Sequence, residues 1–174
     1  MKKILILHGL GGSSKENWFP WAKLKLEKKG MKVIVPDLPN AMNPDSDDWN
    51  ASIKKLIKND EEITVIGHSL GGTAIYKLCE DNKIKIKEAI IIAAPFNDLG
   101  WDNLKLFFTG IKDYSVCNIE KCTLMYSDND PYVPLNHAEE FKKRIQGSEI
   151  LIYRKIGHFN FEGPFLDLLK ILQK

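Results

Sequence analysis

The sequence is poor in cysteine and has no long apolar run. Its 174 residues contain three cysteines, Cys79, Cys117 and Cys122, an odd number without the paired spacing of a metal site. We therefore expect three free thiols and a reducing compartment, the cytoplasm. The longest apolar runs, Ile4–Leu7 and Ala89–Phe96, are far shorter than the roughly 20 residues that cross a bilayer, so we expect a soluble protein with no membrane partner.

An excess of one charge sign is also missing. The chain has 25 Lys and Arg against 23 Asp and Glu, a net charge of +2, and its lysines are scattered. A dedicated nucleic-acid binder carries a basic patch or run, so nucleic acid is a poor candidate partner. Hydrophobic residues make up 44% of the chain, which is enough for a full core. We expect residues 1–174 to form one domain, since single domains commonly have about 100–200 residues.

Short apolar runs alternate with helix-like stretches along the chain. Six runs have the composition of buried strands: Ile4–Leu7, Lys32–Val35, Ile63–Ile66, Ala89–Ala94, Thr123–Tyr126 and Glu149–Tyr153. Five stretches are typical of helices: Lys15–Lys29, Asp47–Lys58, Leu70–Glu80, Leu135–Gln146 and Phe165–Leu172. The alternation predicts an α/β fold, a three-layer α/β/α sandwich around a mainly parallel sheet of about six strands.

The pentapeptide Gly67–Gly71, Gly-His-Ser-Leu-Gly, lies between a strand-like run and a helix-like stretch. Two glycines around a serine can simply form a turn, and the bare pattern arises often by chance. At a strand-to-helix junction of an α/β chain, however, G-x-S-x-G is the pattern of a nucleophile elbow, in which the serine stands on a sharp, strained turn. Ser69 is therefore the candidate nucleophile.

A serine hydroxyl becomes a nucleophile when a histidine accepts its proton and a carboxylate orients that histidine. Two histidines follow the elbow on later elements. His137 lies in an amphipathic helix whose polar residues are expected to face water, whereas His158 follows the last strand-like run, at the sheet edge where such sites assemble. His158 is therefore the candidate base. Asp128 and Asp130 both follow the fifth strand-like run, and the residues alone leave either available as the acid.

An oxyanion hole uses the backbone N–H after the nucleophile and a second N–H from an early strand-to-helix loop. Leu70 supplies the first, and Leu10, in a glycine-rich loop, is the candidate for the second. The segment Asn97–Ser115 interrupts the alternation and carries aromatic residues among polar ones, so it is a candidate cap. The expected pocket walls are His8, Trp18, Trp101, Phe107 and Phe108. For Trp18 and Phe107, a place in the hydrophobic core is an equal alternative.

Together these motifs resemble the α/β-hydrolase superfamily and, within it, the small serine hydrolases typified by bacterial YdeN and the mammalian retinoblastoma-binding serine hydrolase. The resemblance is carried by six motifs: His8-Gly9 with Gly11-Gly12, Asn17–Trp21, Val35–Pro39, Gly67–Gly71, Asp130–Pro134 and Gly157–Asn160. It implies a compact α/β-hydrolase fold with little or no cap. It also implies Ser69 as nucleophile, Asp130 as orienting acid and His158 as general base, without a metal or an organic cofactor.

The expected activity is that of a carboxylesterase on small or short-acyl esters, with thioesters and activated amides as related substrates, through an acyl-enzyme intermediate. Two other classes compete with this hypothesis. Gly9-Leu10-Gly11 begins like a dinucleotide-binding fingerprint, but Ser14 stands at its third glycine position. The second alternative is a non-catalytic interaction protein that retains the hydrolase fold, since fold alone does not establish function.

Overall fold

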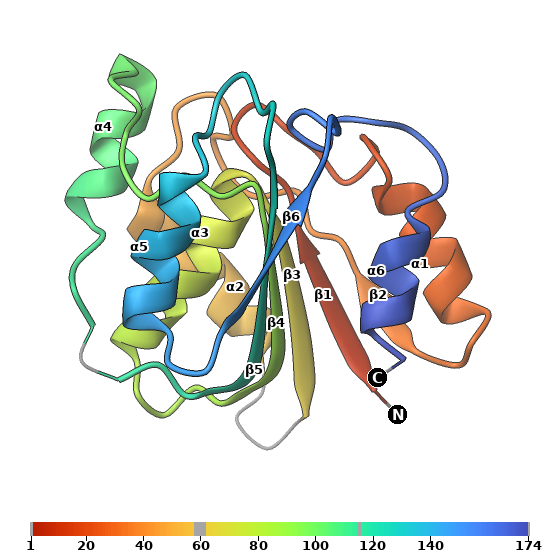
Figure 1. Ribbon diagram of the computed structural model, residues 1–174. Helices are drawn as coiled ribbons and strands as arrows, with labels where there is room; N and C mark the ends of the chain where they lie inside the picture. Colours follow the sequence, from red (N-terminus) through yellow and green to blue (C-terminus); the bar gives the residue numbers. More distant parts are fainter. Residues whose placement is uncertain (1, 58–61, 115, 174) are drawn as a thin grey trace.

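The computed structural model describes residues 2–57, 62–114 and 116–173, and within them the chain forms a six-stranded sheet (Figure 1). All neighbouring strands are parallel, in the spatial order β2-β1-β3-β4-β5-β6. The strands are β1 (Lys3–Leu7), β2 (Lys32–Ile34), β3 (Ile63–His68), β4 (Ile86–Ile92), β5 (Ile119–Ser127) and β6 (Glu149–Tyr153). The predicted α/β fold with a parallel sheet is confirmed.

Helices cover both faces of the sheet (Figure 1). They are α1 (Phe19–Glu27), α2 (Ser46–Leu56), α3 (Leu70–Lys77), α4 (Asp102–Thr109), α5 (Asn136–Arg144) and α6 (Leu166–Ile171), with a 3-10 turn, η1 (Leu78–Glu80), after α3. One core lies between the sheet and α2, α3 and α5, and includes Trp49, Tyr76 and Phe141. The other lies under α1 and α6 and includes Phe19 and Leu168. This sandwich places the carboxyl ends of the parallel strands along one edge.

The residues of β1 show why the sheet needs both helical layers. Ile4 and Ile6 belong to the core under α1 and α6, and Leu5 and Leu7 belong to the opposite core. All four are fully buried. Successive side chains of a strand point to opposite faces, so a strand covered on both faces reads as a continuous apolar run. Because β1 pairs with β3 as far as Leu7 and Gly67, the glycine-rich loop that follows β1 lies next to the end of β3.

The first helix is shorter than the sequence pattern predicts. It begins only at Phe19, with Pro20 in its first turn. Proline has a fixed φ and no backbone N–H to donate, so it suits the first turn of a helix and not its interior. Residues 15–18 therefore form a loop, which borders a pocket at the sheet edge. Two predicted segment ends, Lys58 and Ser115, lie outside the described residues.

The expectation of three free thiols is wrong. Cys79 in η1 and Cys117, before β5, form a disulfide that joins residues 38 apart in sequence. Cys122 on β5 is unpaired, and burial raises the pKa of its thiol to about 12. Sequence spacing does not reveal the pair, because the two cysteines meet only when the chain returns from α4 to the end of α3. The argument from free thiols to a reducing compartment is thereby removed.

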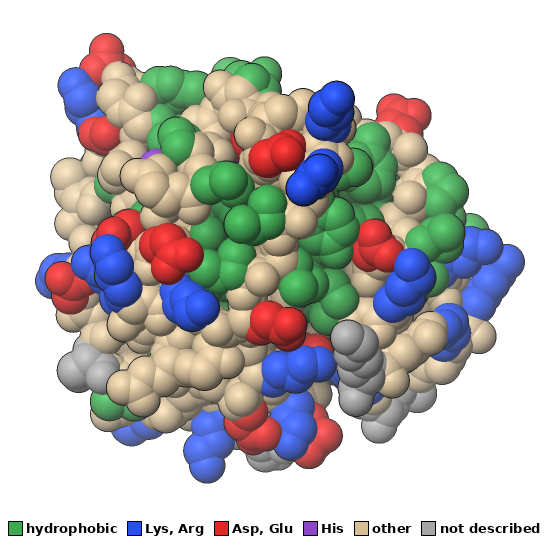
Figure 2. All heavy atoms as spheres, in the orientation of Figure 1, with side chains coloured by type: hydrophobic (Ala, Val, Ile, Leu, Met, Phe, Trp, Pro, Cys, Tyr) green, Lys and Arg blue, Asp and Glu red, His purple; other side chains and the backbone are tan. Residues whose placement is uncertain are grey.

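The surface over β6 is notably apolar. β6 is an edge strand whose backbone pairs with β5 alone. Ile152 of β6 is 60% exposed, and Figure 2 shows hydrophobic side chains gathered on this side of the molecule. Among the described residues, no helix combines the length and the apolar character needed to cross a membrane.

Candidate active site

Ser69 occupies a strained turn between β3 and α3. Its φ and ψ are +53° and −128°, a region that residues with a side chain rarely adopt, and its N–H donates to the Ile92 carbonyl on β4 at 2.8 Å. The flanking glycines are required by close backbone contacts. A Cβ atom on Gly67 would collide with the backbone of Gly71, and one on Gly71 would lie 2.5 Å from the Leu7 carbonyl oxygen. Ser69 therefore stands on a sharp, strained turn that only glycine can flank on both sides.

The loop after β1 lies directly against this turn. A Cβ atom on Gly9 would come within 2.7 Å of the Ser69 Cβ, so only glycine fits there. The Gly9 carbonyl accepts a hydrogen bond from His8 Nδ1 at 2.9 Å. His8 Nε2 in turn accepts from the Leu38 N–H at 2.9 Å, which fixes the ring in its Nδ1-protonated tautomer. These bonds hold the loop that carries Leu10 beside Ser69.

Asp130 and His158 come together from the loops after β5 and β6. His158 Nδ1 lies 2.7 Å from Asp130 Oδ2, and both side chains are almost completely buried. The other carboxylate oxygen, Oδ1, accepts from the N–H groups of Tyr132 at 2.9 Å and Val133 at 3.0 Å. Burial alone would raise the pKa of Asp130, but the hydrogen bonds from His158 and from these two N–H groups lower it below its usual value. The ionised carboxylate can therefore orient the ring with Nδ1 protonated.

Four hydrogen bonds join the two loops, one from each residue of 155–158 to a side chain within 127–130. They run from Lys155 N–H to Asp128 Oδ1 (2.8 Å), Ile156 N–H to Ser127 Oγ (3.0 Å), Gly157 N–H to Asn129 Oδ1 (2.8 Å) and His158 Nδ1 to Asp130 Oδ2 (2.7 Å). We call this set the loop ladder. It fixes the backbone that leads into the His158 ring. The sequence motifs did not indicate that Ser127 and Asn129 take part in this network. An unbroken polar run directly after a buried strand is a signal that could have indicated it.

The structure separates the alternatives that the sequence left open. Asp128 bonds to the Lys155 backbone rather than to His158. His137 does not face water as expected: it is buried on α5, and its Nδ1 accepts from the Phe96 N–H at 2.7 Å. Burial also lowers the pKa of His137. Asp130 and His158 are thus the pair that meets at the carboxyl edge of the sheet.

His68, the residue before Ser69, is a buried neighbour of the candidate base. Its Nε2–H donates to the His158 carbonyl at 2.7 Å, and the two rings lie 5.0 Å apart. Trp18 and Phe19 pack edge-on against the His68 ring. Burial, together with the nearby His158, lowers the pKa of His68 to about 3, so the ring is neutral. The sequence pattern does not indicate this contact, because the two histidines are 90 residues apart.

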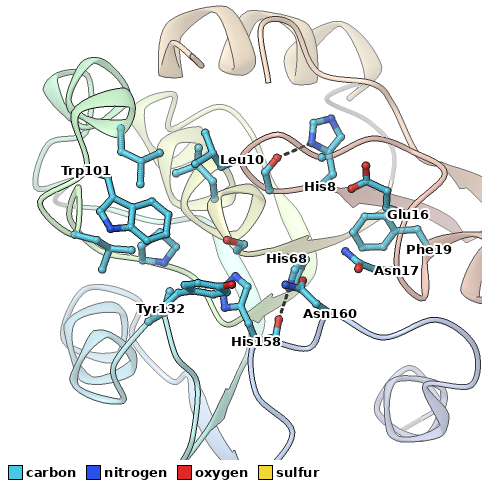
Figure 3. Close-up of a pocket in the computed structure, with 18 residues that line it drawn as sticks. His8, Leu10, Glu16, Asn17, Phe19, His68, Trp101, Tyr132, His158 and Asn160 are labelled. Atoms are coloured by element: carbon cyan, nitrogen blue, oxygen red, sulfur yellow. Dashed lines mark hydrogen bonds between the residues drawn. The ribbon is translucent and has the colours of Figure 1, made fainter. Parts of the chain in front are cut away.

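A cavity of about 460 Å³ opens at the sheet edge (Figure 3). Ser69 and His158 line it together with Leu10 and Leu70, so the predicted nucleophile, base and oxyanion donors share one cavity. Leu70 is the first residue of α3. First-turn N–H groups have no partner within their own helix, so the Leu70 N–H can donate to a ligand.

The predicted wall residues divide into two groups. His8 and Trp101 line the cavity. For Trp18 and Phe107 the alternative of a core position holds, since both are fully buried in the two cores on opposite faces of the sheet. The expectation of a wall position is wrong for Phe108, which lines a separate hollow. Phe107 and Phe108 lie at the end of α4, whereas the cavity is reached by Leu99, Trp101 and Leu104, at the start of this helix and before it. Trp18 precedes α1 and packs edge-on against Phe19 and Phe165.

A protein-family model of serine hydrolases matches residues 4–172 of the chain. The chain belongs to the serine hydrolase family. The resemblance drawn from the sequence motifs is thereby confirmed. The protein YdeN of Bacillus subtilis (strain 168) is 25% identical to this serine hydrolase over 173 residues, which cover 96% of this chain and 90% of YdeN.

Solved structures share the fold of this serine hydrolase. The crystal structure of the Bacillus subtilis ydeN gene product superposes with a TM-score of 0.81 and 21% identity, and all of each chain is covered. Est1E from Butyrivibrio proteoclasticus, solved with ferulic acid bound, gives a TM-score of 0.76 and 18% identity over 99% of this chain and 86% of Est1E. At these identities the likeness establishes the fold.

The chemistry available in this serine hydrolase site is that of nucleophilic catalysis. An ionised carboxylate, an imidazole with a fixed Nδ1 proton, a hydroxyl on a strained turn and backbone N–H donors are the groups that acyl transfer requires. Within residues 2–57, 62–114 and 116–173, no three His, Cys, Asp or Glu side chains are grouped as the ligands of a metal ion would be.

Proposed function

We propose that this serine hydrolase is a carboxylesterase for small or short-acyl esters, with Ser69 as nucleophile, His158 as general base and Asp130 as orienting acid. The observation that carries the proposal is the 2.7 Å bond from His158 Nδ1 to Asp130 Oδ2, beside the cavity that Ser69 lines. Thioesters and activated amides undergo the same chemistry and are related substrates.

Acylation begins as Ser69 Oγ attacks the ester carbonyl carbon and His158 Nε2 takes the hydroxyl proton. The Asp130 carboxylate stabilises the imidazolium that forms. The carbonyl oxygen becomes an oxyanion, which accepts hydrogen bonds from the N–H groups of Leu10 and Leu70. As this intermediate collapses, the bond to the alcohol breaks, His158 protonates the departing oxygen, and the acyl group remains on Ser69.

Deacylation repeats these steps with water. His158 takes a proton from a water molecule as its oxygen attacks the acyl carbon, and the same two N–H groups receive the second oxyanion. The bond to Ser69 Oγ then breaks, Oγ recovers the proton from His158, and the carboxylic acid leaves. No proton or electron is left over, so the cycle needs water alone as a second substrate.

The size of the cavity supports a small substrate. Its volume of about 460 Å³ lies in the lower half of the range of roughly 300–1,000 Å³ that is usual for ligand pockets. Est1E, which shares the fold, binds ferulic acid, a small carboxylic acid. Both observations favour esters of compact acids over those of long-chain fatty acids.

Labelling with a fluorophosphonate probe tests the proposed nucleophile. We expect stoichiometric modification of Ser69 in the wild-type protein and none in Ser69→Ala, with circular dichroism showing that both are folded. A folded wild-type protein that stays unlabelled contradicts the proposal and favours the non-catalytic interaction protein. With p-nitrophenyl esters, we expect kcat/KM to fall for the longest acyl chains, whereas a steady rise up to palmitate contradicts the short-acyl preference.

A further inference from the structure

One side of the cavity is apolar. Leu99, Trp101 and Leu104 come from the segment after β4, and Tyr132 and Val133 come from the loop after β5. Trp101 and Tyr132 are 39% and 47% exposed, and their rings form an edge-to-face pair with centroids 5.9 Å apart. Large aromatic side chains stabilise a fold mainly when they are buried. A pair that is exposed at the mouth of a cavity instead offers a surface for a flat apolar group.

The other side of the cavity carries three polar side chains beside the ring of Phe19, which is fully buried. Glu16 and Asn17 come from the loop before α1, and Asn160 follows His158 in the loop after β6. Figure 3 shows these three side chains across the cavity from Trp101 and Tyr132. In the part of the chain that the structure describes, none of the three side chains has a hydrogen-bond or ion-pair partner. Their carboxylate and amide groups are therefore available to hydroxyl groups of a ligand.

We propose that the apolar side is the acyl subsite, that the polar side is the leaving-group subsite, and that the substrate is an ester of an aryl-bearing carboxylic acid with a polyhydroxy alcohol. The inference rests on the proposed esterase function. It assigns Trp101 and Tyr132 to the aryl group and Glu16, Asn17 and Asn160 to the hydroxyl groups.

The direction of binding follows from what each half of the ester must do. The departing oxygen receives its proton from His158, and Asn160 belongs to the same loop as His158. Water must then reach the acyl carbon by the path that the alcohol has left, and a polar wall can bind both. The acyl group stays attached to Ser69 between the two steps, so an apolar wall that binds it does not impede exit of the first product.

Three esters separate the two subsites: ethyl acetate, ethyl 3-phenylpropanoate and 2,3-dihydroxypropyl 3-phenylpropanoate. Acid release is followed at constant pH, and rates are divided by the amount of Ser69 that a fluorophosphonate titrates. For the wild-type protein we expect kcat/KM to be about tenfold higher for the phenylpropanoate than for the acetate, as an apolar pocket discriminates. We expect it to be about fivefold higher for the dihydroxypropyl ester than for the ethyl ester, since hydroxyl groups there gain partners.

Two variants and two matched controls assign these ratios to residues. We call the kcat/KM of the ethyl phenylpropanoate divided by that of the acetate the acyl ratio, and the kcat/KM of the dihydroxypropyl ester divided by that of the ethyl phenylpropanoate the alcohol ratio. Trp101→Ala should reduce the acyl ratio to near one and leave the alcohol ratio unchanged. Glu16→Ala should reduce the alcohol ratio to near one and leave the acyl ratio unchanged. Leu106→Ala, at an exposed position of α4, and Glu139→Ala, at an exposed position of α5, lie outside the cavity lining and should change neither ratio.

Each other outcome overturns the inference. Ratios near one in the wild-type protein, or variants that lower both ratios together, show that the cavity is not divided. If Trp101→Ala lowers the alcohol ratio and Glu16→Ala the acyl ratio, the substrate binds in the opposite direction. If the probe labels Ser69 but the ratios are not as expected, this inference alone is contradicted. If the probe never labels Ser69, the proposed function is contradicted, and the inference is rejected with it.

Discussion

The loops after β5 and β6 and the segment after β4 reach the same cavity but are held in different ways. The loop ladder joins residues 127–130 to residues 155–158 through hydrogen bonds of 2.7 to 3.0 Å. In the segment 97–114, the part that reaches the cavity is instead held by apolar packing of Leu104 and Phe107. Farther along, this segment is tied to α3 by the hydrogen bonds from Lys77 Nζ to the Gly110 carbonyl (2.7 Å) and from the Tyr114 N–H to the Tyr76 hydroxyl (3.2 Å), and then by the disulfide that follows it, from Cys117 to Cys79. Hydrogen bonds fix direction as well as distance, whereas apolar packing does not.

This difference matches what the proposed function requires of each region. A general base must hold its proton-accepting nitrogen within hydrogen-bond distance of the nucleophile, and small displacements reduce the rate steeply. A pocket wall needs only the right shape and polarity, so its residues can change without loss of the chemistry. The expected consequence is that changes in the ladder reduce turnover, and changes in the wall alter stability or substrate preference.

Asp130→Asn should have the largest effect of the changes considered. The amide Oδ1 can still accept from Tyr132 and Val133, but an amide NH₂ in place of Oδ2 faces His158 Nδ1 as a donor. The ring must then place its proton on Nε2, which can no longer accept the Ser69 proton. We expect kcat to fall by about 10³–10⁴. Asp128→Asn is the matched control, because its amide oxygen can still accept from the Lys155 N–H, and a similar loss of rate in both variants contradicts the assignment.

The disulfide provides the next largest effect, on the wall side. A cross-link over a separation of 38 residues typically stabilises a fold by roughly 2–4 kcal/mol. Replacing Cys79 and Cys117 by alanine should lower the free energy of unfolding by about this amount, and hydrogen exchange should speed up in α4 more than in residues 127–130. Thiol titration of the denatured, unreduced protein tests whether the disulfide is present. One thiol per chain, that of Cys122, is expected, whereas three thiols per chain rule out the disulfide.

His68 links the elbow to the base loop and makes stability depend on pH. Its pKa is about 3 in the folded protein against 6.5 for an ordinary histidine, because the ring is buried and lies near His158. Between these values the unfolded chain binds a proton that the native state does not, so the free energy of unfolding decreases as the pH falls below 6.5. From pH 7 to pH 5 this one group should cost about 2 kcal/mol.

His68→Gln isolates that contribution. Glutamine keeps an N–H donor for the His158 carbonyl and does not titrate. Urea unfolding at several pH values should therefore show a flatter pH dependence in the variant, by about 2 kcal/mol between pH 7 and pH 5. Contributions from Asp130, His137 and the other titrating groups cancel in the comparison. Parallel curves for the two proteins mean that His68 takes up its proton over the same pH range in the folded and the unfolded protein, so that its pKa is not lowered by folding.

The sequence predicts well what depends on short stretches of chain. The continuous apolar run of β1 indicated a strand covered on both faces, and Gly67 and Gly71 around Ser69 indicated a turn that side chains would block. Both features are determined by a few adjacent residues. The order of elements then placed the loops after β3, β5 and β6 at one edge, because parallel strands end on the same side.

What the sequence did not predict depends on contacts between distant segments. The disulfide of Cys79 and the burial of His137 both arise from packing of one helix or turn against another. For Trp18 and Phe107 the sequence left a wall position and a core position open, and only the orientation of α1 and α4 decides that they are core residues. Aromatic residues serve equally in cores and at binding sites, so their type alone does not separate the two.

Asn129→Ala should have the smallest effect and is the sharpest test of the loop ladder. Asn129 Oδ1 accepts from the Gly157 N–H at 2.8 Å and from Ser127 Oγ at 2.9 Å, and it contacts neither Ser69 nor the His158 ring through a hydrogen bond. Its loss removes both bonds, but Asn129 is exposed and water can take its place, so the free energy of unfolding should fall by only about 1 kcal/mol. The loss should also lower kcat about tenfold with KM nearly unchanged, because the ring is less well positioned in both chemical steps. Asn129→Asp keeps the acceptor oxygens and should recover most of the rate. If Asn129→Ala loses stability but keeps the kcat of the titrated active sites, the ladder stabilises the fold without positioning His158.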